Sequence, residues 1–231
     1  RRPPRSTLFP YHDALPISLS LGAARVNCQT WIGGVGDWDV ASNWSTSSVP
    51  TSTSDVIIGN GGVVTIPISF AAVASTIEVQ SGGSLNITSG ASLTINIIGF
   101  DFAAMTVAGA LDNAGTLTIG NIIEPIVFAC FFQGGSLTNS GTFDIYDAGV
   151  ALLDCSTNNS ITNSGTINLG VNSSNTTGTS LRITDAVNFT NSGTINLAKT
   201  ANGTAAVDIN NSSAVFTNSG NLNLTELGGD G

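Results

Sequence analysis

The sequence predicts an all-β fold: a single-stranded parallel β-helix, a three-sided solenoid with rungs of about 24–28 residues. Two observations predict it. One phrase recurs from residue 111 onward, as LDNAGTLTI, LTNSGTFDI, ITNSGTINL, FTNSGTINL and FTNSGNLNL, and a repeat at this period is typical of solenoids. Within each copy, apolar and polar residues alternate on both sides of a central glycine, as expected for two strands joined by a turn.

The centre of each copy is predicted to be a sharp corner. Glycine accepts a positive φ at no steric cost, and asparagine tolerates the left-handed region better than most residues. On stacked rungs the asparagines would form a hydrogen-bonding ladder. The corner residues are Asn113, Asn139, Asn163, Asn191 and Asn218, with Gly115, Gly141, Gly165, Gly193 and Gly220.

A third apolar segment lies between successive copies, at 126–132, 150–155, 179–184 and 205–210. Three short strands per repeat fit one turn of a parallel β-helix, in which each strand pairs with its counterpart one rung later at ~4.8 Å. A sandwich of antiparallel hairpins would explain the turns, but not the return of one phrase at one interval. Stacking predicts two inner ladders, Leu137, Ile161, Phe189 and Phe216, and Ile145, Leu169, Leu197 and Leu224.

Upstream of the copies, residues 75–95 alternate in the same way and are expected to form earlier rungs. We expect residues 29–65 to form an N-terminal cap with the first strands, because Trp31, Trp38 and Trp44 supply the bulky cover that an exposed first rung needs. Residues 66–231 would be the β-helix repeat domain. Its last phrase stops in mid-pattern, which predicts a truncated or open-ended solenoid.

The first 28 residues differ from the rest. Residues 1–17 hold three of the six basic residues and the single histidine, and they resemble translated sequencing-adapter read-through. A disordered basic tail is the alternative, and in either case this segment is excluded from the fold. Residues 18–28 are interpreted as the remnant of a secretory signal cleaved after Cys28. A lipoprotein signal fits less well because of Arg25 and Asn27, and a buried first strand is the other alternative.

From Gln29 onward the chain has 2 basic and 14 acidic residues, so its net charge is −12. Such a surface disfavours nucleic acid and anionic membranes. The most apolar window, 122–132, is interrupted by Glu124 and Pro125 and is shorter than the ~20 residues of a membrane-spanning helix. We therefore expect no nucleic-acid partner and no transmembrane segment.

Candidates for catalysis are few. With the histidine excluded, no nucleophile–base–orienter set can be assembled. Asp144, Asp147 and Asp154 are the candidates for the paired carboxylates of a polysaccharide lyase or glycosidase. A lyase would also need a cation to stabilise the developing anion, and Arg182 and Lys199 lie at least one rung away. Solvated surface aspartates are therefore the preferred interpretation.

The cysteines and the cap aspartates are candidates for covalent or metal chemistry. Cys130 and Cys155 lie about one rung apart, so their side chains are expected to stack on neighbouring rungs. A disulfide and two buried free thiols both remain open. Asp37 and Asp39 flank Trp38 and are candidates for calcium ligands, although one Asp-x-Asp pair offers few of the oxygens that calcium takes. No zinc site can be assembled.

The outward positions after each corner form an array that resembles the regular threonine arrays of ice-binding solenoids. Asparagine and aspartate interrupt this array, and such residues are also ordinary on the outer face of a strand. Its members are Thr116 and Thr118, Thr142 and Asp144, Thr166 and Asn168, Thr194 and Asn196, and Asn221 and Asn223.

The segment WIGGVGDWDVASNWSTSSVPTSTSDVII, with IEVQSGGSLNI and the NSGTI phrases after it, resembles secreted and surface β-helix proteins of Bacteroidetes-type bacteria. The resemblance implies export and an adhesive or surface-layer role. We therefore expect a secreted or cell-surface structural or adhesive solenoid, not an enzyme. It would bind an extracellular glycan or surface protein over an extended face and could self-associate laterally. The alternatives are a polysaccharide-degrading β-helix or its accessory module, and an ice-binding solenoid.

Overall fold

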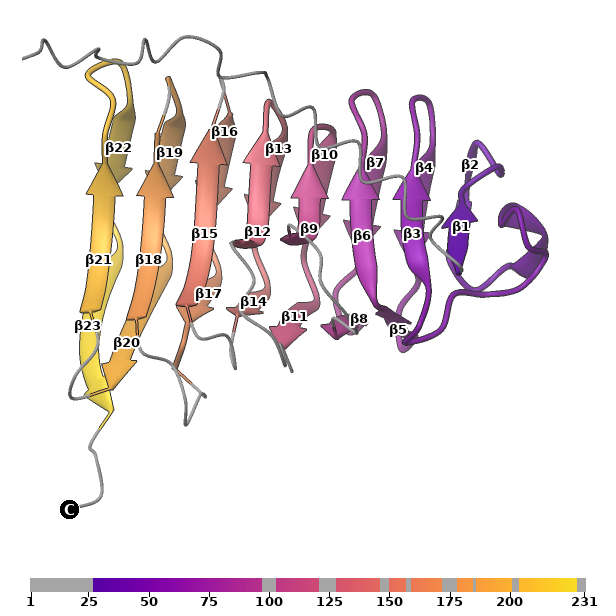
Figure 1. The fold of residues 1–231 in the computed structure, drawn as a ribbon, viewed down its shortest axis with the longest axis horizontal. Coiled ribbons are helices and arrows are strands. Elements are labelled where there is room, and N and C mark those ends of the chain that lie inside the picture. The colour runs from indigo at the N-terminus through magenta and orange to yellow at the C-terminus, as the bar shows by residue number, and fades with distance from the viewer. Residues whose placement is uncertain are drawn as a thin grey trace, which may run out of the picture.

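The computed structural model describes residues 27–96, 103–120, 128–145, 150–156, 159–171, 178–184, 186–200 and 204–227. The predicted fold class is confirmed: these residues form a β-solenoid of three sheets, in which strands from successive rungs run parallel. Figure 1 shows the rungs following one another along the long axis, from β1 and β2 at one end to β21, β22 and β23 at the other. The antiparallel sandwich is therefore excluded.

Each rung contributes one strand to each sheet, except that the first rung has β1 and β2 and no strand in sheet 3. Sheet 1 contains β1 (Cys28–Thr30), β3 (Asp55–Ile58), β6 (Thr76–Val79), β9 (Ala103–Val107), β12 (Phe128–Gln133), β15 (Val150–Ser156), β18 (Gly178–Ile183) and β21 (Thr204–Ile209). Sheet 2 contains β2 (Val35–Asp37), β4 (Val63–Ile66), β7 (Ser84–Ile87), β10 (Ala110–Asn113), β13 (Ser136–Asn139), β16 (Ser160–Asn163), β19 (Asn188–Asn191) and β22 (Val215–Asn218). Sheet 3 contains β5 (Ala71–Ala74), β8 (Ser92–Asn96), β11 (Thr116–Gly120), β14 (Thr142–Ile145), β17 (Thr166–Leu169), β20 (Thr194–Thr200) and β23 (Asn221–Leu227).

The core runs along the solenoid axis and is built from alternate residues of every strand. Both predicted inner ladders are confirmed, because their members pair in register from rung to rung. Ile161 and Leu169 are fully buried, while Leu224 in the last rung is 60% exposed. Burying one such side chain stabilises the fold by roughly 1.5–3 kcal/mol, so most of the stability comes from stacking rung on rung.

The asparagine ladder at the corner between sheets 2 and 3 is also present. Asn139 Nδ2 donates to Asn163 Oδ1 at 2.7 Å, and Asn163 Nδ2 donates to Asn191 Oδ1 at 2.7 Å. Asn113 starts the ladder by donating to Asn139, and Asn191 continues it to Asn218. The ladder therefore ties together five successive rungs through four buried amides and the exposed amide of Asn218.

The predicted reason for the corner glycines is wrong. The glycines with positive φ are Gly34, Gly61, Gly82, Gly90, Gly134 and Gly170, and none of them is a corner glycine of the repeat. Space is the actual reason: a Cβ on Gly165 would lie closer than 3.0 Å to the carbonyl oxygen of Gly141. A Cβ on Gly193 would meet the carbonyl oxygen of Gly165 in the same way. The rungs stack so tightly at this corner that no side chain fits between them.

The N-terminal end is closed by the segment that follows β2. The free edge of β1 is paired antiparallel with residues 43–45, through the Ile32 N–H to the Asn43 carbonyl (2.8 Å) and the Ser45 N–H to the Thr30 carbonyl (2.9 Å). A short 3₁₀ helix, η1 (Ala41–Asn43), leads into this pairing. β1 begins at Cys28, so strand pairing starts one residue before the predicted signal cleavage point, and residues 1–26 lie outside the described part.

The three tryptophans pack together beneath this covering segment. Trp31 and Trp38 each meet Trp44 edge to face, with ring centroids 5.0 and 4.9 Å apart. Trp44 Nε1 donates to the Trp38 carbonyl at 2.8 Å. All three side chains are buried, so they close the N-terminal end of the apolar core. Among the described residues, no helix has the length and hydropathy needed to cross a membrane.

Candidate functional site

The outer face of sheet 3 carries a second amide ladder. Asn168 Nδ2 donates to Asp144 Oδ1 at 2.6 Å, Asn196 Nδ2 donates to Asn168 Oδ1 at 2.7 Å, and Asn223 Nδ2 donates to Asn196 Oδ1 at 2.8 Å. Beside this ladder, four threonines pair in register on successive strands of sheet 3: Thr116, Thr142, Thr166 and Thr194. The array predicted from the sequence therefore exists, but its amides are bonded to one another.

The outer face of sheet 2 differs in this respect. Thr138, Thr162, Thr190 and Thr217 pair in register on four successive strands and are all exposed. We call these four residues the threonine column. Their hydroxyl groups make no hydrogen bond to another residue in the described part of the chain. The column was missed from the sequence, although the recurring threonine directly before each corner asparagine was its signal.

The predicted carboxylates do not form a pair. Asp144 lies on β14 in sheet 3, where it accepts the hydrogen bond from Asn168. Asp154 lies on β15 in sheet 1, and Asp147 lies outside the described residues. Because Asp144 and Asp154 stand on different sides of the solenoid, the arrangement of two facing carboxylates that a glycosidase needs is not built from them.

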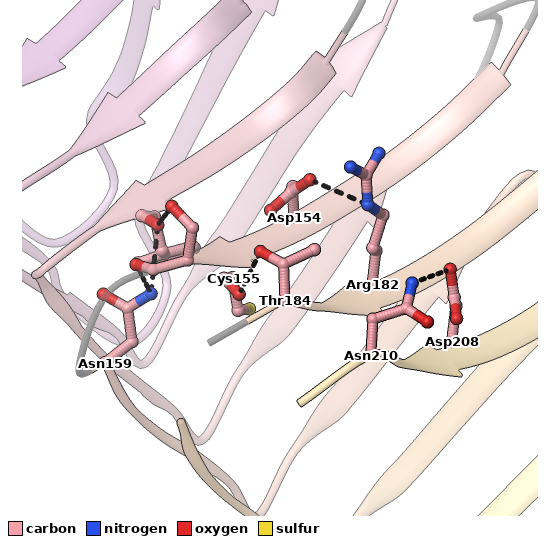
Figure 2. Close-up of polar contacts among 9 residues, drawn as sticks. Asp154, Cys155, Asn159, Arg182, Thr184, Asp208 and Asn210 are labelled. Carbon is pink, nitrogen blue, oxygen red and sulfur yellow. Dashed lines mark hydrogen bonds and ion pairs between the residues drawn. The ribbon is translucent and has the colours of Figure 1, made fainter. Parts of the chain in front are cut away.

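Asp154 is nevertheless unusual, because it is an outward residue that is only 1% exposed. Arg182 is its register partner on β18, and the guanidinium Nε lies 3.5 Å from the carboxylate Oδ2 (Figure 2). The other oxygen, Oδ1, has no hydrogen-bond partner among the described residues. Burial raises the pKa of Asp154, and Arg182 opposes this rise. The sequence-based view of Arg182 as too distant is wrong, because one rung in sequence is one strand spacing in space.

The two cysteines of the repeat domain are buried free thiols. Cys130 pairs in register with Leu153, and Cys155 pairs with Phe132, so the cysteines are two positions apart and do not stack. The expected stacking is wrong for two reasons that add up to this offset. Cys155 lies one residue nearer its corner glycine than Cys130 does, and the connection before β16 is one residue longer than the connection before β13. Burial, followed by the neighbouring Cys155, raises the pKa of Cys130, and burial also raises the pKa of Cys155. Such neutral thiols are poor nucleophiles and metal ligands.

The two candidate calcium ligands of the cap, Asp37 and Asp39, are not joined by further acidic side chains in the described residues. Asp37 is the last residue of β2 and Asp39 follows two residues later, and both are exposed. Within the described ranges, no group of three or more His, Cys, Asp or Glu side chains is placed to hold a metal ion. The structure thus adds no third carboxylate to Asp37 and Asp39.

Comparison with known proteins bears on one part of the chain. Residues 30–119 match a family described as a domain of unknown function (DUF8693). The matched region extends from the tryptophan-rich cap to β11 and includes the first corner, at Asn113. No curated protein and no solved structure matches the chain. The similarity therefore supports a recurring cap-and-rung unit and carries no activity with it.

Proposed function

We propose that this chain is a secreted or cell-surface solenoid with a structural or adhesive role, which binds an extracellular glycan through the outer face of sheet 2. The observation that carries the proposal is the threonine column. Its hydroxyls repeat at the strand spacing of ~4.8 Å on an exposed surface. A glycan presents repeated hydroxyl groups, and many weak contacts along one surface add up to useful avidity.

Sheet 2 is a better binding face than sheet 3 for a physical reason. A ligand that docks on sheet 3 must displace existing hydrogen bonds, such as that between Asn196 and Asn168. A ligand that docks on the threonine column exchanges only water, because Thr162 and Thr190 are exposed and their hydroxyls are unbonded within the described residues. Net stabilisation by a new hydrogen bond is modest, about 0.5–1.5 kcal/mol, so several rungs must act together.

Export is supported by the signal-like residues 18–28. The acidic composition keeps a protein soluble and disfavours binding to anionic surfaces. The proposal contains no catalytic step. It gives the solenoid the role of a rigid, elongated surface on which a ligand lies flat.

The test is binding of the full chain to immobilised bacterial and plant polysaccharides and to a glycan microarray. The double variant Thr162→Val, Thr190→Val removes two hydroxyls of the threonine column while keeping side-chain shape and strand propensity. We expect it to lower binding about tenfold. The matched control Thr166→Val, Thr194→Val makes the same change on sheet 3 and should leave binding unchanged.

Several results would contradict the proposal. Equal losses in both double variants would show that the face is not specific, and capture of proteins but no glycan would reassign the partner. Turnover of any polysaccharide by the wild-type chain would favour the polysaccharide-degrading alternative. Thermal hysteresis of its solutions without glycan binding would favour the ice-binding alternative.

A further inference from the structure

A shallow hollow of about 230 Å³ lies at the corner between sheets 2 and 3. It spans three rungs, at the ends of β7, β10 and β13. Its outward lining consists of Asn86, Thr88, Asp112, Ala114, Thr138 and Ser140. The hollow therefore begins where the threonine column begins, since Thr138 belongs to both.

The hollow coincides with two departures from the repeat. The first copy has Asp112 where the later copies have threonine, and Ala114 where the later copies have serine. Both exceptional residues line the hollow, and both belong to its middle rung. The small alanine leaves room between Thr88 and Ser140, and the aspartate places a negative charge at the edge of that room.

The polar groups of the hollow stand in one row. Asp112 pairs in register with Asn86 on one side and Thr138 on the other, so an amide, a carboxylate and a hydroxyl follow one another at the strand spacing of ~4.8 Å. The carboxylate of Asp112 is exposed and makes no hydrogen bond to another described residue. Asp144, by contrast, accepts a hydrogen bond from Asn168. The fold leaves the oxygens of Asp112 available to a ligand.

A second unsatisfied group lies in the same rung. The side chain of Asn113 is 1% exposed, and its Oδ1 has no hydrogen-bond partner in the described part of the chain. The cause is that the inner asparagine ladder starts here: the register partner on β7 is Ile87, which offers no donor. Asn113 also lines the hollow. Asn113 Oδ1 thus lacks the donor that the equivalent oxygens of Asn139, Asn163 and Asn191 have.

We propose that this hollow binds a single neutral sugar ring, as the anchoring subsite of the glycan-binding face. The inference rests on the proposed function for the class of ligand. A carboxylate is the strongest acceptor available for sugar hydroxyls, and Asn86 and Thr138 can each donate and accept. Ala114 and the methyl groups of the threonines offer apolar surface to the C–H face of the ring, in keeping with sites that combine apolar walls and few polar groups.

The size and the charge of the hollow restrict the class of sugar that it can bind. The volume is below the ~300 Å³ at which pockets begin to enclose drug-sized molecules, so one ring enters and the rest of the chain lies along the threonine column. No lysine, arginine or histidine lines the hollow. A uronic acid would therefore meet the carboxylate of Asp112 without compensation, and a neutral hexose is the ligand that fits.

The test is ligand-observed NMR on the full chain with the methyl glycosides of glucose, galactose, mannose and glucuronic acid. We expect at least one neutral glycoside to bind and the glucuronide not to bind. Asp112→Asn should weaken binding about tenfold. The matched control Asp144→Asn makes the same substitution outside the hollow and should not change it. Ala114→Leu, which fills the hollow and leaves the charge, should abolish binding, with circular dichroism to verify the fold.

Three results would overturn the inference: equal binding by wild type and Asp112→Asn, glucuronide binding as tight as that of the neutral glycosides, or a Ca²⁺ titration that shifts the Asp112 carboxylate resonance when no glycoside does.

The polysaccharide assay separates the two proposals. If polysaccharides bind and Thr162→Val, Thr190→Val lowers that binding while Asp112→Asn has no effect, the subsite is wrong and the proposed function stands. If methyl hexosides bind and Asp112→Asn weakens them while polysaccharides do not bind, the subsite stands and the extended face is wrong.

Discussion

The rungs before residue 97 and the rungs from residue 110 onward turn the corner between sheets 2 and 3 by different means. In the earlier rungs one residue with a positive φ makes the turn, Ser69 between β4 and β5 and Gly90 between β7 and β8. In the later rungs a buried asparagine and a tightly stacked glycine do so, without positive φ. The same three-sided rung can thus be closed by local backbone conformation or by contacts with neighbouring rungs.

The two kinds of corner differ in which residues stabilise them. A turn built on a left-handed residue depends on its own few residues. A corner built on the asparagine ladder depends on the rungs above and below it, as in a chain of nearest-neighbour interactions. Substitutions should therefore have local effects in the earlier rungs and effects that spread in the later ones.

The largest loss of stability is expected for substitution of a corner glycine in the later rungs. Gly165→Ala places a Cβ closer than 3.0 Å to backbone atoms of Gly141 and Ser140, so two rungs must separate, at a cost of about 4–5 kcal/mol. Gly90→Ala at the same corner of an earlier rung adds only left-handed strain and a contact with the exposed Ile68, about 1–2 kcal/mol. Urea unfolding measures both, and equal losses would refute the distinction.

The second prediction concerns the ladder itself. Asn163→Ala removes the donor to Asn191 Oδ1 and one acceptor of the Asn139 amide. It also removes the N–H donor that the Gly165 and Thr194 carbonyls share. We expect a loss of about 2–4 kcal/mol, because each unsatisfied buried group costs about 1–3 kcal/mol. Asn218→Ala, at the exposed end of the ladder, is the control and should cost less than about 1 kcal/mol. A thermal melt in which both variants lose the same stability would argue against a cooperative ladder.

The third prediction is that the stability of the later rungs around Asp154 depends on pH, while the packing of the N-terminal cap does not. Burial raises the pKa of Asp154 in the folded state above the ordinary aspartate value of about 3.9. The folded state then binds the proton more tightly, so its stabilisation is complete below that ordinary value and is lost as pH rises through the raised pKa. Amide exchange in β15 and β18 should become faster, relative to intrinsic rates, over this range. Asp154→Asn should remove the dependence, while tryptophan fluorescence from the cap stays constant in both proteins.

The smallest effect is expected at the serine of the corner. Ser164 Oγ donates to the Asn139 carbonyl at 3.4 Å from an exposed position. Ser164→Ala should change the free energy of unfolding by no more than about 0.5 kcal/mol. The chain already tolerates this residue, because Ala114 occupies the equivalent position. A loss comparable to that of Asn163→Ala in the same urea experiment would mean that the serine, too, belongs to the ladder.

Much of the fold could be predicted because strand alternation and a repeat of fixed length are visible in one sequence. The inner apolar ladders and the asparagine ladder follow from that repeat alone. The role of the corner glycines could not be predicted, since the distance between Gly165 and Gly141 in space has no counterpart in the sequence. The prediction that Cys130 and Cys155 stack was wrong for a similar reason. Their positions were counted from the corner glycines, and the connections in between differ in length.

The proposed binding face was harder to predict than the fold. The sequence predicted an outward array at the residues after each glycine. In the structure the amides of this array bond to one another, as those of Asn196 and Asn168 do. The exposed threonine column lies before the corner. Asp112 and Ala114 could be taken for ordinary divergence of the first copy, because only the stacking of three rungs shows that both line one hollow.

The column of corner glycines also bears on how such a gene changes in length. In the four later copies the nearest neighbours of the corner glycine are backbone atoms of the preceding rung, so a duplicated rung that carries its own glycine keeps this contact. Unequal recombination between copies as similar as ITNSGTINL and FTNSGTINL would add or remove one complete rung and leave the column unbroken. The solenoid can therefore evolve in whole rungs, and its length can be adjusted without redesign of its core.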